Sequence, residues 1–388
     1  MKKIKTVLAA TSVLLLTACQ KQSGLTDTTN NSLLSESPKR NTSLTTISGS
    51  PAGYVYTLSN EVSGNKVLVY SRSVDGTLSF AGDFATGGNG AGDPLLNQGG
   101  INLGADNILL AVNAGSNSIS SLLVNGGDLD WKSTISSGGT RPLSITRYGN
   151  YVFVLNGGTN SNISGFILNT DGTLTAIPNS TRPLSTPDAQ PSQIEFVNNG
   201  TVLVVTERAT DKIITYTVDG SGIPQLMHSI TAANPTPFGF AQGANGNIFV
   251  SEAAGGLPGV SSLSSYHINA DGSIALIKGP VFTNHTSACW VVLTNSGKYA
   301  YTINSDDGTI STFDVNTSTG NIKLNTATSA SAQPGLIDAA LTNNSKFEYV
   351  LNIGDHSISA FAVAGDGSLS NIQTVTGLPL VANGLIAR

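Results

Sequence analysis

The sequence predicts an all-β, seven-bladed β-propeller with four antiparallel strands in each blade, and three observations carry that prediction. Pairs of short β-rich runs around a polar turn recur, as in residues 298–304 followed by 309–315. The chain has 43 glycines and only 11% charged residues, which suits short strands and tight turns better than helices. One apolar residue follows each hairpin turn at intervals of 45 to 51 residues: Leu78, Leu129, Leu174, Ile223, Ile274, Ile322 and Leu369. Seven such units are typical of a propeller.

The third unit shows how the four strands of a blade are assigned. We expect its strands at 142–147, 151–156, 162–168 and 174–177, from the centre outwards. Asp-Gly pairs lie between third and fourth strands, where glycine supplies the positive φ of a two-residue hairpin turn. A calcium site is the alternative for these aspartates, but one carboxylate per turn is far below the oxygen ligands that calcium requires. The pairs begin at Asp75, Asp171, Asp271 and Asp366.

The two ends of the repeat region belong together. The first unit, from Tyr54, has no run before it that could serve as an innermost strand. Residues 378–388 match an innermost strand and have no blade of their own. We therefore expect the carboxy-terminal strand to complete the first blade, which closes the ring and removes a free sheet edge.

The amino terminus is a targeting segment. Three lysines precede an apolar stretch at 7–16, which is too short to span a bilayer. Leu16-Thr17-Ala18-Cys19 resembles the bacterial lipobox, in which the cysteine is lipidated; an ordinary secretory signal is the alternative. We expect a signal peptide at 1–18, a flexible tether at 19–50 and the propeller at 51–388.

Charge restricts the partners. Without the three signal lysines, 16 basic residues face 24 acidic residues, a net charge near −8. This charge argues against nucleic acid and anionic lipid surfaces as partners, and membrane contact is expected only through the lipid anchor. We expect an exported, monomeric lipoprotein of the bacterial cell envelope, periplasmic or surface-facing.

Two stretches and a recurrent strand ending carry a resemblance to a known family. The stretches are 190–208, with Gln-Pro-Ser-Gln-Ile-Glu-Phe and Val-Val-Thr-Glu-Arg, and 288–304, with Ala-Cys-Trp-Val and Gly-Lys-Tyr-Ala-Tyr-Thr-Ile-Asn. With the Tyr-Val-x-Asn strand endings, they resemble the lactonase family of propellers with YVTN-type repeats, which includes 6-phosphogluconolactonases and carboxymuconate-cyclase-like proteins. The resemblance implies lactone hydrolysis. Arg141 and the second-strand glutamates match its site residues, whereas no histidine occupies an inner-strand start.

Propeller geometry puts the ends of second strands and the starts of innermost strands on one face. Most second strands end in asparagine, which we interpret as turn caps. Glu207 and Glu252 interrupt this pattern. They are candidate general bases or cation ligands, or else solvated carboxylates paired with Arg208 or Arg141. We expect these glutamates, Arg141, Phe238 and Trp290 to converge in a partly solvated site.

Other residues complete the set of candidates. Cys289 with His285 is a candidate nucleophile and base, although a buried cysteine beside Trp290 is more often packing. Phe238 and Trp290 are a candidate apolar or sugar-stacking wall. No metal-ligand spacing appears, and no cofactor is expected. Further ligand-binding candidates are Arg208, Gln190, Gln333 and Asn304.

Two functions follow from these residues. One is a binding module for a small molecule, a sugar or an envelope protein. The other is a lactonase-like hydrolase that uses Glu207, Glu252, Arg141 and His285. The binding module is favoured because the histidines of the family are absent and the chain has only four histidines for acid–base chemistry.

Overall fold

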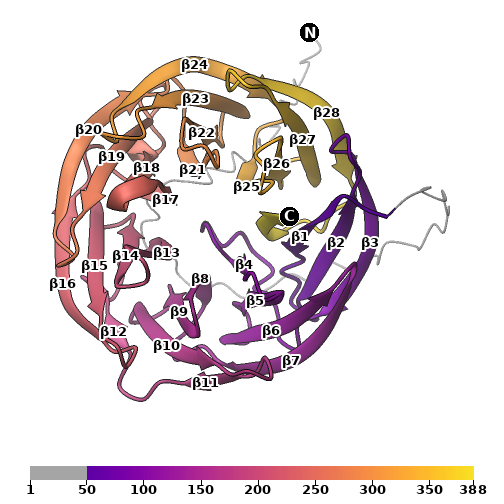
Figure 1. The fold of residues 1–388 in the computed structure, drawn as a ribbon, viewed down its shortest axis with the longest axis vertical. Helices are drawn as coiled ribbons and strands as arrows, with labels where there is room; N and C mark the ends of the chain where they lie inside the picture. The colour runs from indigo at the N-terminus through magenta and orange to yellow at the C-terminus, as the bar shows by residue number, and fades with distance from the viewer. Residues whose placement is uncertain (1–49) are drawn as a thin grey trace, which may run out of the picture.

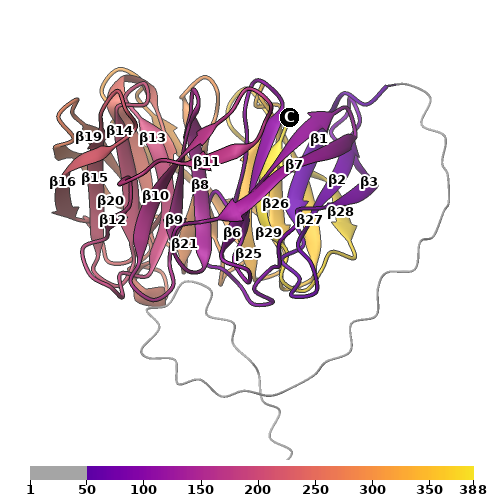
Figure 2. The ribbon, with the colours of Figure 1, turned by 90° about the horizontal axis from the view of Figure 1, so that it is seen from below.

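The computed structural model describes residues 50–388, which form a closed ring of seven four-stranded antiparallel sheets (Figure 1). Seen from the side, the ring is a flat cylinder whose strands run from one face to the other (Figure 2). The predicted fold class is confirmed. The predicted signal peptide and nearly all of the tether lie outside the described residues. No helix within 50–388 is long and apolar enough to cross a membrane.

The first four blades run around the ring in chain order, each described from the centre outwards. Blade 1 consists of β29 (Asn383–Ala387), β1 (Gly53–Leu58), β2 (Lys66–Arg72) and β3 (Leu78–Ala85). Blade 2 consists of β4 (Ile101–Leu103), β5 (Ile108–Asn113), β6 (Ser118–Asn125) and β7 (Asp128–Ser136). Blade 3 consists of β8 (Pro142–Tyr148), β9 (Tyr151–Asn156), β10 (Asn162–Leu168) and an outer edge divided into β11 (Leu174–Ala176) and β12 (Arg182–Pro183). Blade 4 consists of β13 (Pro191–Val197), β14 (Val202–Glu207), β15 (Lys212–Val218) and β16 (Pro224–Thr231).

The last three blades complete the ring. Blade 5 consists of β17 (Pro237–Gln242), β18 (Asn247–Glu252), β19 (Ser262–Ile268) and β20 (Ile274–Phe282), with short 3-10 turns η1 (Ala244–Gly246) and η2 (Ala254–Gly256). Blade 6 consists of β21 (Ala288–Leu293), β22 (Tyr299–Asn304), β23 (Thr309–Val315) and β24 (Ile322–Ser331). Blade 7 consists of β25 (Leu336–Leu341), β26 (Phe347–Asn352), β27 (Ser357–Val363) and β28 (Leu369–Thr376).

The carboxy-terminal strand closes the ring as predicted, although it is shorter than the predicted 378–388. β29 pairs antiparallel with β1, with Val55 opposite Ala387. Asp338 in β25 reinforces the closure, because its carboxylate accepts the backbone N–H of Leu385 at 3.0 Å. Residues 378–382 form the turn that carries the chain inwards from β28, so they are not part of the strand.

The hydrophobic core lies between adjacent blades. Third strands carry the recurrent apolar-x-x-aromatic-x-apolar pattern, and period-two alternation turns the aromatic ring towards a neighbouring blade. These rings are at most 2% exposed: Phe166, Tyr216, Tyr266, Phe313 and Phe361. The repeat therefore specifies both the strands and the packing between them.

The Asp-Gly hairpins differ from the expected two-residue turns. In the first, Ser73 and Thr77 pair across a three-residue loop in which only Gly76 has positive φ, 88°. The Asp75 carboxylate accepts the Thr77 backbone N–H at 3.0 Å and its hydroxyl at 2.7 Å. The aspartates are therefore turn caps, which supports a structural role over a calcium site.

Candidate functional site at the mouth of the central channel

Both candidate glutamates end second strands on the predicted face, and both are fully buried. Glu207, at the end of β14, is 0% exposed. One carboxylate oxygen accepts the Ser185 backbone N–H at 2.9 Å, and the other accepts the hydroxyls of Ser185 and Thr210. Glu207 therefore fastens the connection between blades 3 and 4.

Glu252, at the end of β18, has the same character. It is 0% exposed and accepts hydroxyl donors from Ser262 at 2.6 Å, Ser264 at 2.7 Å and Tyr266 at 2.9 Å. Burial raises the pKa of its carboxyl, and the three hydroxyl contacts oppose that rise. The expectation of a partly solvated pair of glutamates is wrong, because neighbouring hydroxyl groups enclose both side chains.

Phe238 and Trp290 lie beneath the channel mouth rather than at its surface. They are 0% and 1% exposed, and their ring centroids are 4.8 Å apart. The Trp290 indole N–H donates to the Asn97 carbonyl at 2.8 Å. Both rings, together with the fully buried Cys289, belong to one hydrophobic cluster. The two aromatic side chains therefore support the site from below and do not offer a stacking wall.

Arg208 is the unusual residue of this region. Its side chain is 5% exposed, and its guanidinium carbon lies 5.5 Å from the centroid of the Phe238 ring. Nε and Nη1 are buried and have no hydrogen-bond partner among residues 50–388. Burial, and secondly the charge of Arg141, lower the pKa of Arg208 to about 10, so the guanidinium remains positive at neutral pH. The site thus contains a buried cation with unused donors.

Arg141 lies at the start of β8, on the rim beside Arg208. Its Nη2 is 3.1 Å from both carboxylate oxygens of Asp93, whose side chain is 55% exposed. Asp93 balances the charge of Arg141, whereas Arg208 has no such carboxylate within the described chain. Asp93 and Arg141 each precede a proline, at corresponding positions of neighbouring units. This shared position is the sequence signal that could have identified Asp93 as a residue of the site.

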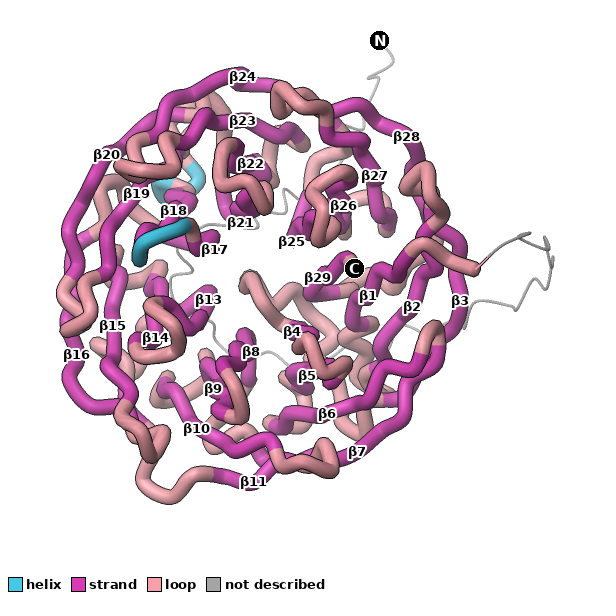
Figure 3. The backbone as a smooth tube through the Cα atoms, viewed as in Figure 1, coloured by secondary structure: helices cyan, strands magenta, loops and turns pink. Residues whose placement is uncertain are grey.

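The loop that follows Asp93 enters the middle of the ring, which the sequence did not predict (Figure 3). Gln98 crosses the channel to the backbone of Val291 in blade 6. Its side-chain NH2 donates to the Val291 carbonyl at 2.9 Å, and its side-chain oxygen accepts the Val291 N–H at 3.2 Å. It occupies the space beside Gly239, where a Cβ atom would come within 1.9 Å of the Gln98 side-chain oxygen. The Gln98 side chain therefore plugs the channel below its mouth.

The remaining binding candidates are dispersed around the same face. Gln190 precedes β13 with a φ of 47°, and its carbonyl accepts the Arg208 backbone N–H at 3.2 Å. Gln333 is exposed before β25. Asn304 is buried and donates to the hydroxyls of Thr309 at 3.1 Å and Ser311 at 2.8 Å, which is a structural role across β22 and β23.

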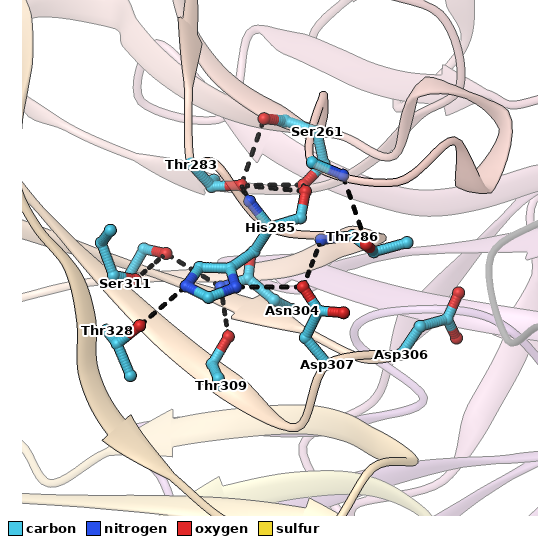
Figure 4. A network of polar contacts seen from close by, with 12 residues as sticks. Ser261, Thr283, His285, Thr286, Asn304, Asp306, Asp307, Thr309, Ser311 and Thr328 are labelled. Atoms are coloured by element: carbon cyan, nitrogen blue, oxygen red, sulfur yellow. Dashed lines mark hydrogen bonds and ion pairs between the residues drawn. The ribbon is translucent and has the colours of Figure 1, made fainter.

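His285 lies on the connection between blades 5 and 6, within a network of its own (Figure 4). Its Nδ1 is 3.0 Å from the Asp307 carboxylate, and its Nε2 is 2.8 Å from the Thr328 hydroxyl. Asp307 also accepts the Thr286 backbone N–H at 2.8 Å. Both ring nitrogens are thus engaged, and the contacts fix this connection against the outer strand of blade 6. Within residues 50–388, no group of three or more His, Cys, Asp or Glu side chains could hold a metal ion.

Comparisons with known proteins agree with this architecture. The family model described as Lactonase, 7-bladed beta-propeller, matches residues 259–378. None of the curated proteins matches the sequence. The fold and these comparisons define the chain as a lactonase-like propeller scaffold.

Three solved structures share this fold at low sequence identity. A protein from Lactobacillus plantarum is similar at TM-score 0.68 and 17% identity, covering 87% of this chain and 99% of its own. A candidate 6-phosphogluconolactonase from Bacteroides fragilis is similar at TM-score 0.66 and 16% identity, covering 87% of this chain and 98% of its own. A periplasmic gluconolactonase from Pseudomonas aeruginosa is similar at TM-score 0.63 and 16% identity, covering 85% of this chain and 98% of its own. At these identities the likeness is one of fold.

Proposed function

We propose that this protein is an envelope-anchored propeller that binds a small organic anion at the mouth of the central channel. The observation that carries the proposal is the buried Arg208 guanidinium, whose Nε and Nη1 have no partner within the described chain. A buried charge without a partner is strongly unfavourable. A carboxylate or phosphate oxygen is the acceptor that such guanidinium donors favour, through a charge-assisted hydrogen bond.

The surroundings support an anion of modest size. Arg141 adds a second positive charge at the rim, and Asp93 holds its guanidinium in place. The Gln98 plug limits how deep a ligand can enter. An aldonate or a sugar phosphate has the required charge, with hydroxyl groups for the polar rim.

Anchoring in the envelope rests on the sequence around Cys19. The lipobox-like Leu16-Thr17-Ala18-Cys19 motif follows a basic and apolar start. The name of the periplasmic gluconolactonase of Pseudomonas aeruginosa places that structural neighbour outside the cytoplasm, which is consistent with an exported propeller.

Lactone hydrolysis is the second candidate, favoured by the family match over residues 259–378. The closed environments of Glu207 and Glu252 weaken their assignment as bases, and Asp93 is the exposed carboxylate beside the two arginines. In this version Asp93 takes a proton from the attacking water and returns it to the ring oxygen as the acyl–oxygen bond breaks, and the new carboxylic acid releases its proton to solvent. The product is then an anion suited to Arg208.

The test is calorimetric titration of the mature protein with gluconate, 6-phosphogluconate and glucono-lactone, with glucose as a neutral comparison. We expect the anions to bind and glucose not to bind. Arg208→Met should weaken anion binding at least 30-fold while raising the melting temperature, because it removes an unpaired buried charge. A residue kept only for packing would show the opposite stability change.

Arg147→Met is the matched control. Arg147 lies near the end of β8 on the opposite face and holds Asp106 through two contacts of 2.7 Å, so its loss should leave anion affinity unchanged. The proposal is wrong if none of the anions binds, or if Arg208→Met binds them as tightly as the native protein. Acid release from the lactone, abolished by Asp93→Asn, would select hydrolysis over binding alone.

A further inference from the structure

Two adjacent cavities lie on the face opposite the channel mouth, where innermost strands end and the hairpin turns lie. The larger, about 650 Å³, is between blades 4 and 5, beside the β13–β14 and β19–β20 turns. The smaller, about 330 Å³, is between blades 5 and 6, beside the β21–β22 and β23–β24 turns. Both volumes are in the range of small-ligand sites.

One short segment separates the two cavities. Gln242, Gly243 and Ala244, which lead from β17 into η1, line both of them. Gln242 and Ala244 are exposed, so this segment is a ridge with one cavity on each side. A ligand that crosses the ridge can occupy both cavities at once.

The linings are polar and carry almost no charge. Neither cavity is lined by Asp, Glu, Lys or Arg, and the single titratable side chain is His267. His267 Nδ1 is already 3.0 Å from the Asn247 side-chain oxygen. A charged ligand would find no opposite charge here, which separates this face chemically from the anion site around Arg208.

Amide side chains supply the recognition groups. Asn199, Gln242, Asn245 and Asn295 are exposed along the two cavities. Each carries both a hydrogen-bond donor and an acceptor, as a sugar hydroxyl also does. Asn198, in contrast, already donates to the carbonyls of Ile268 and Asn269 and serves the turn.

We propose that this pair of cavities binds a neutral oligosaccharide, with at least one sugar unit on each side of the Gln242–Ala244 ridge. The uncharged, amide-rich lining suits a ligand with many hydroxyl groups. The ridge between two cavities suits a ligand built from repeated units, because one unit can occupy each cavity. A peptide is disfavoured because its recognition normally uses a free sheet edge, apolar anchor pockets or charged end groups. The one aromatic residue of the smaller cavity, Phe249, is 1% exposed and acts as floor.

The test uses neutral oligosaccharides of one to six units from the malto-, cello- and chito-series, titrated into the mature protein. We expect at least one series to bind, with tetramers at least 10-fold tighter than the corresponding single sugar, because longer chains reach both cavities. The double variant Gln242→Ala/Asn295→Ala should lower that affinity at least 10-fold. Both positions are exposed, so the fold should be retained.

Asn343→Ala is the matched control, because Asn343 is the exposed turn residue of blade 7 that corresponds to Asn295 and lines neither cavity. It should bind sugars as the native protein does. Binding should also survive Arg208→Met, which keeps this inference independent of the anion site. Absence of binding by every series, affinity independent of chain length, or affinity unchanged in the double variant would each overturn it.

Discussion

Glu348 should make the protein lose stability as pH rises through the neutral range. This residue lies in β26, is 0% exposed, and neither of its carboxylate oxygens has a hydrogen-bond partner within residues 50–388. Burial raises the pKa of its carboxyl from 4.5 to about 8. Tyr301 of blade 6 is close enough for the Glu348 charge to add to the rise of the Tyr301 pKa, which burial mainly causes.

The direction of this change in stability with pH depends on whether the folded or the unfolded chain holds the proton of Glu348. Between about pH 4.5 and pH 8 the folded protein keeps a proton on Glu348 that the unfolded chain has released. The contribution of this group to stability is therefore complete below pH 4.5 and is lost as pH rises towards 8. One proton corresponds to about 1.4 kcal/mol per pH unit, so the loss amounts to about 2–5 kcal/mol across this window.

The assay is urea unfolding at pH 5, 6, 7 and 8 for the native protein, Glu348→Gln and Glu348→Leu. Neither replacement titrates, so both variants should show a shallower decline in the free energy of unfolding, by about 1.4 kcal/mol per pH unit. Their absolute stabilities will differ, because leucine needs no hydrogen bond and glutamine does. Parallel pH profiles for all three proteins would refute the reasoning.

Four further changes test other parts of the structure. Deletion of 378–388 removes β29 and should abolish cooperative unfolding or solubility; native melting behaviour in the truncated chain would contradict the closure. Glu252→Gln should cost about 1–3 kcal/mol in urea unfolding, because an amide cannot accept all three hydroxyl donors as the carboxylate does. Gln98→Ala should cost a similar amount, about 1–3 kcal/mol, since it leaves the Val291 backbone groups unpaired in the plugged channel. Cys19→Ser should move the protein from the membrane pellet to the soluble fraction, and retention after a high-salt wash would count against lipidation.

The sequence predicted the fold because the repeat has a direct physical meaning. Most units bury one aromatic ring against a neighbouring blade, and alternation along the third strand fixes where that ring points, as Phe313 shows. The closure of the ring by the carboxy-terminal strand was predictable, because the unit that begins at Tyr54 has no innermost strand and the carboxy-terminal strand has no blade of its own. The divided outer edge of blade 3 was not, since β12 (Arg182–Pro183) has only two residues and no strand pattern.

The site was predicted less well, because burial and partner choice are tertiary properties. Position in the repeat identified Glu207 and Glu252 as unusual, but their hydroxyl donors lie on other strands and loops. Arg208 was named as a ligand-binding candidate and as a partner for these glutamates, whereas the structure places its guanidinium over the Phe238 ring. Gln98 could not be recognised at all, since its partner Val291 is 193 residues away in the chain.

A buried ionisable group without a partner has different consequences depending on whether it can become neutral at the pH of the cell. Glu348 relieves its burial by keeping a proton, because its raised pKa of about 8 lies above neutrality. Arg208 has no equivalent route, since its lowered pKa of about 10 still leaves it positive at neutral pH. An unpartnered buried carboxyl is therefore a pH-dependent element of stability, whereas an unpartnered buried guanidinium calls for an anion from outside the described chain. That difference, rather than the number of carboxylates on the face, is the reason for placing Arg208 at the centre of the proposed anion site.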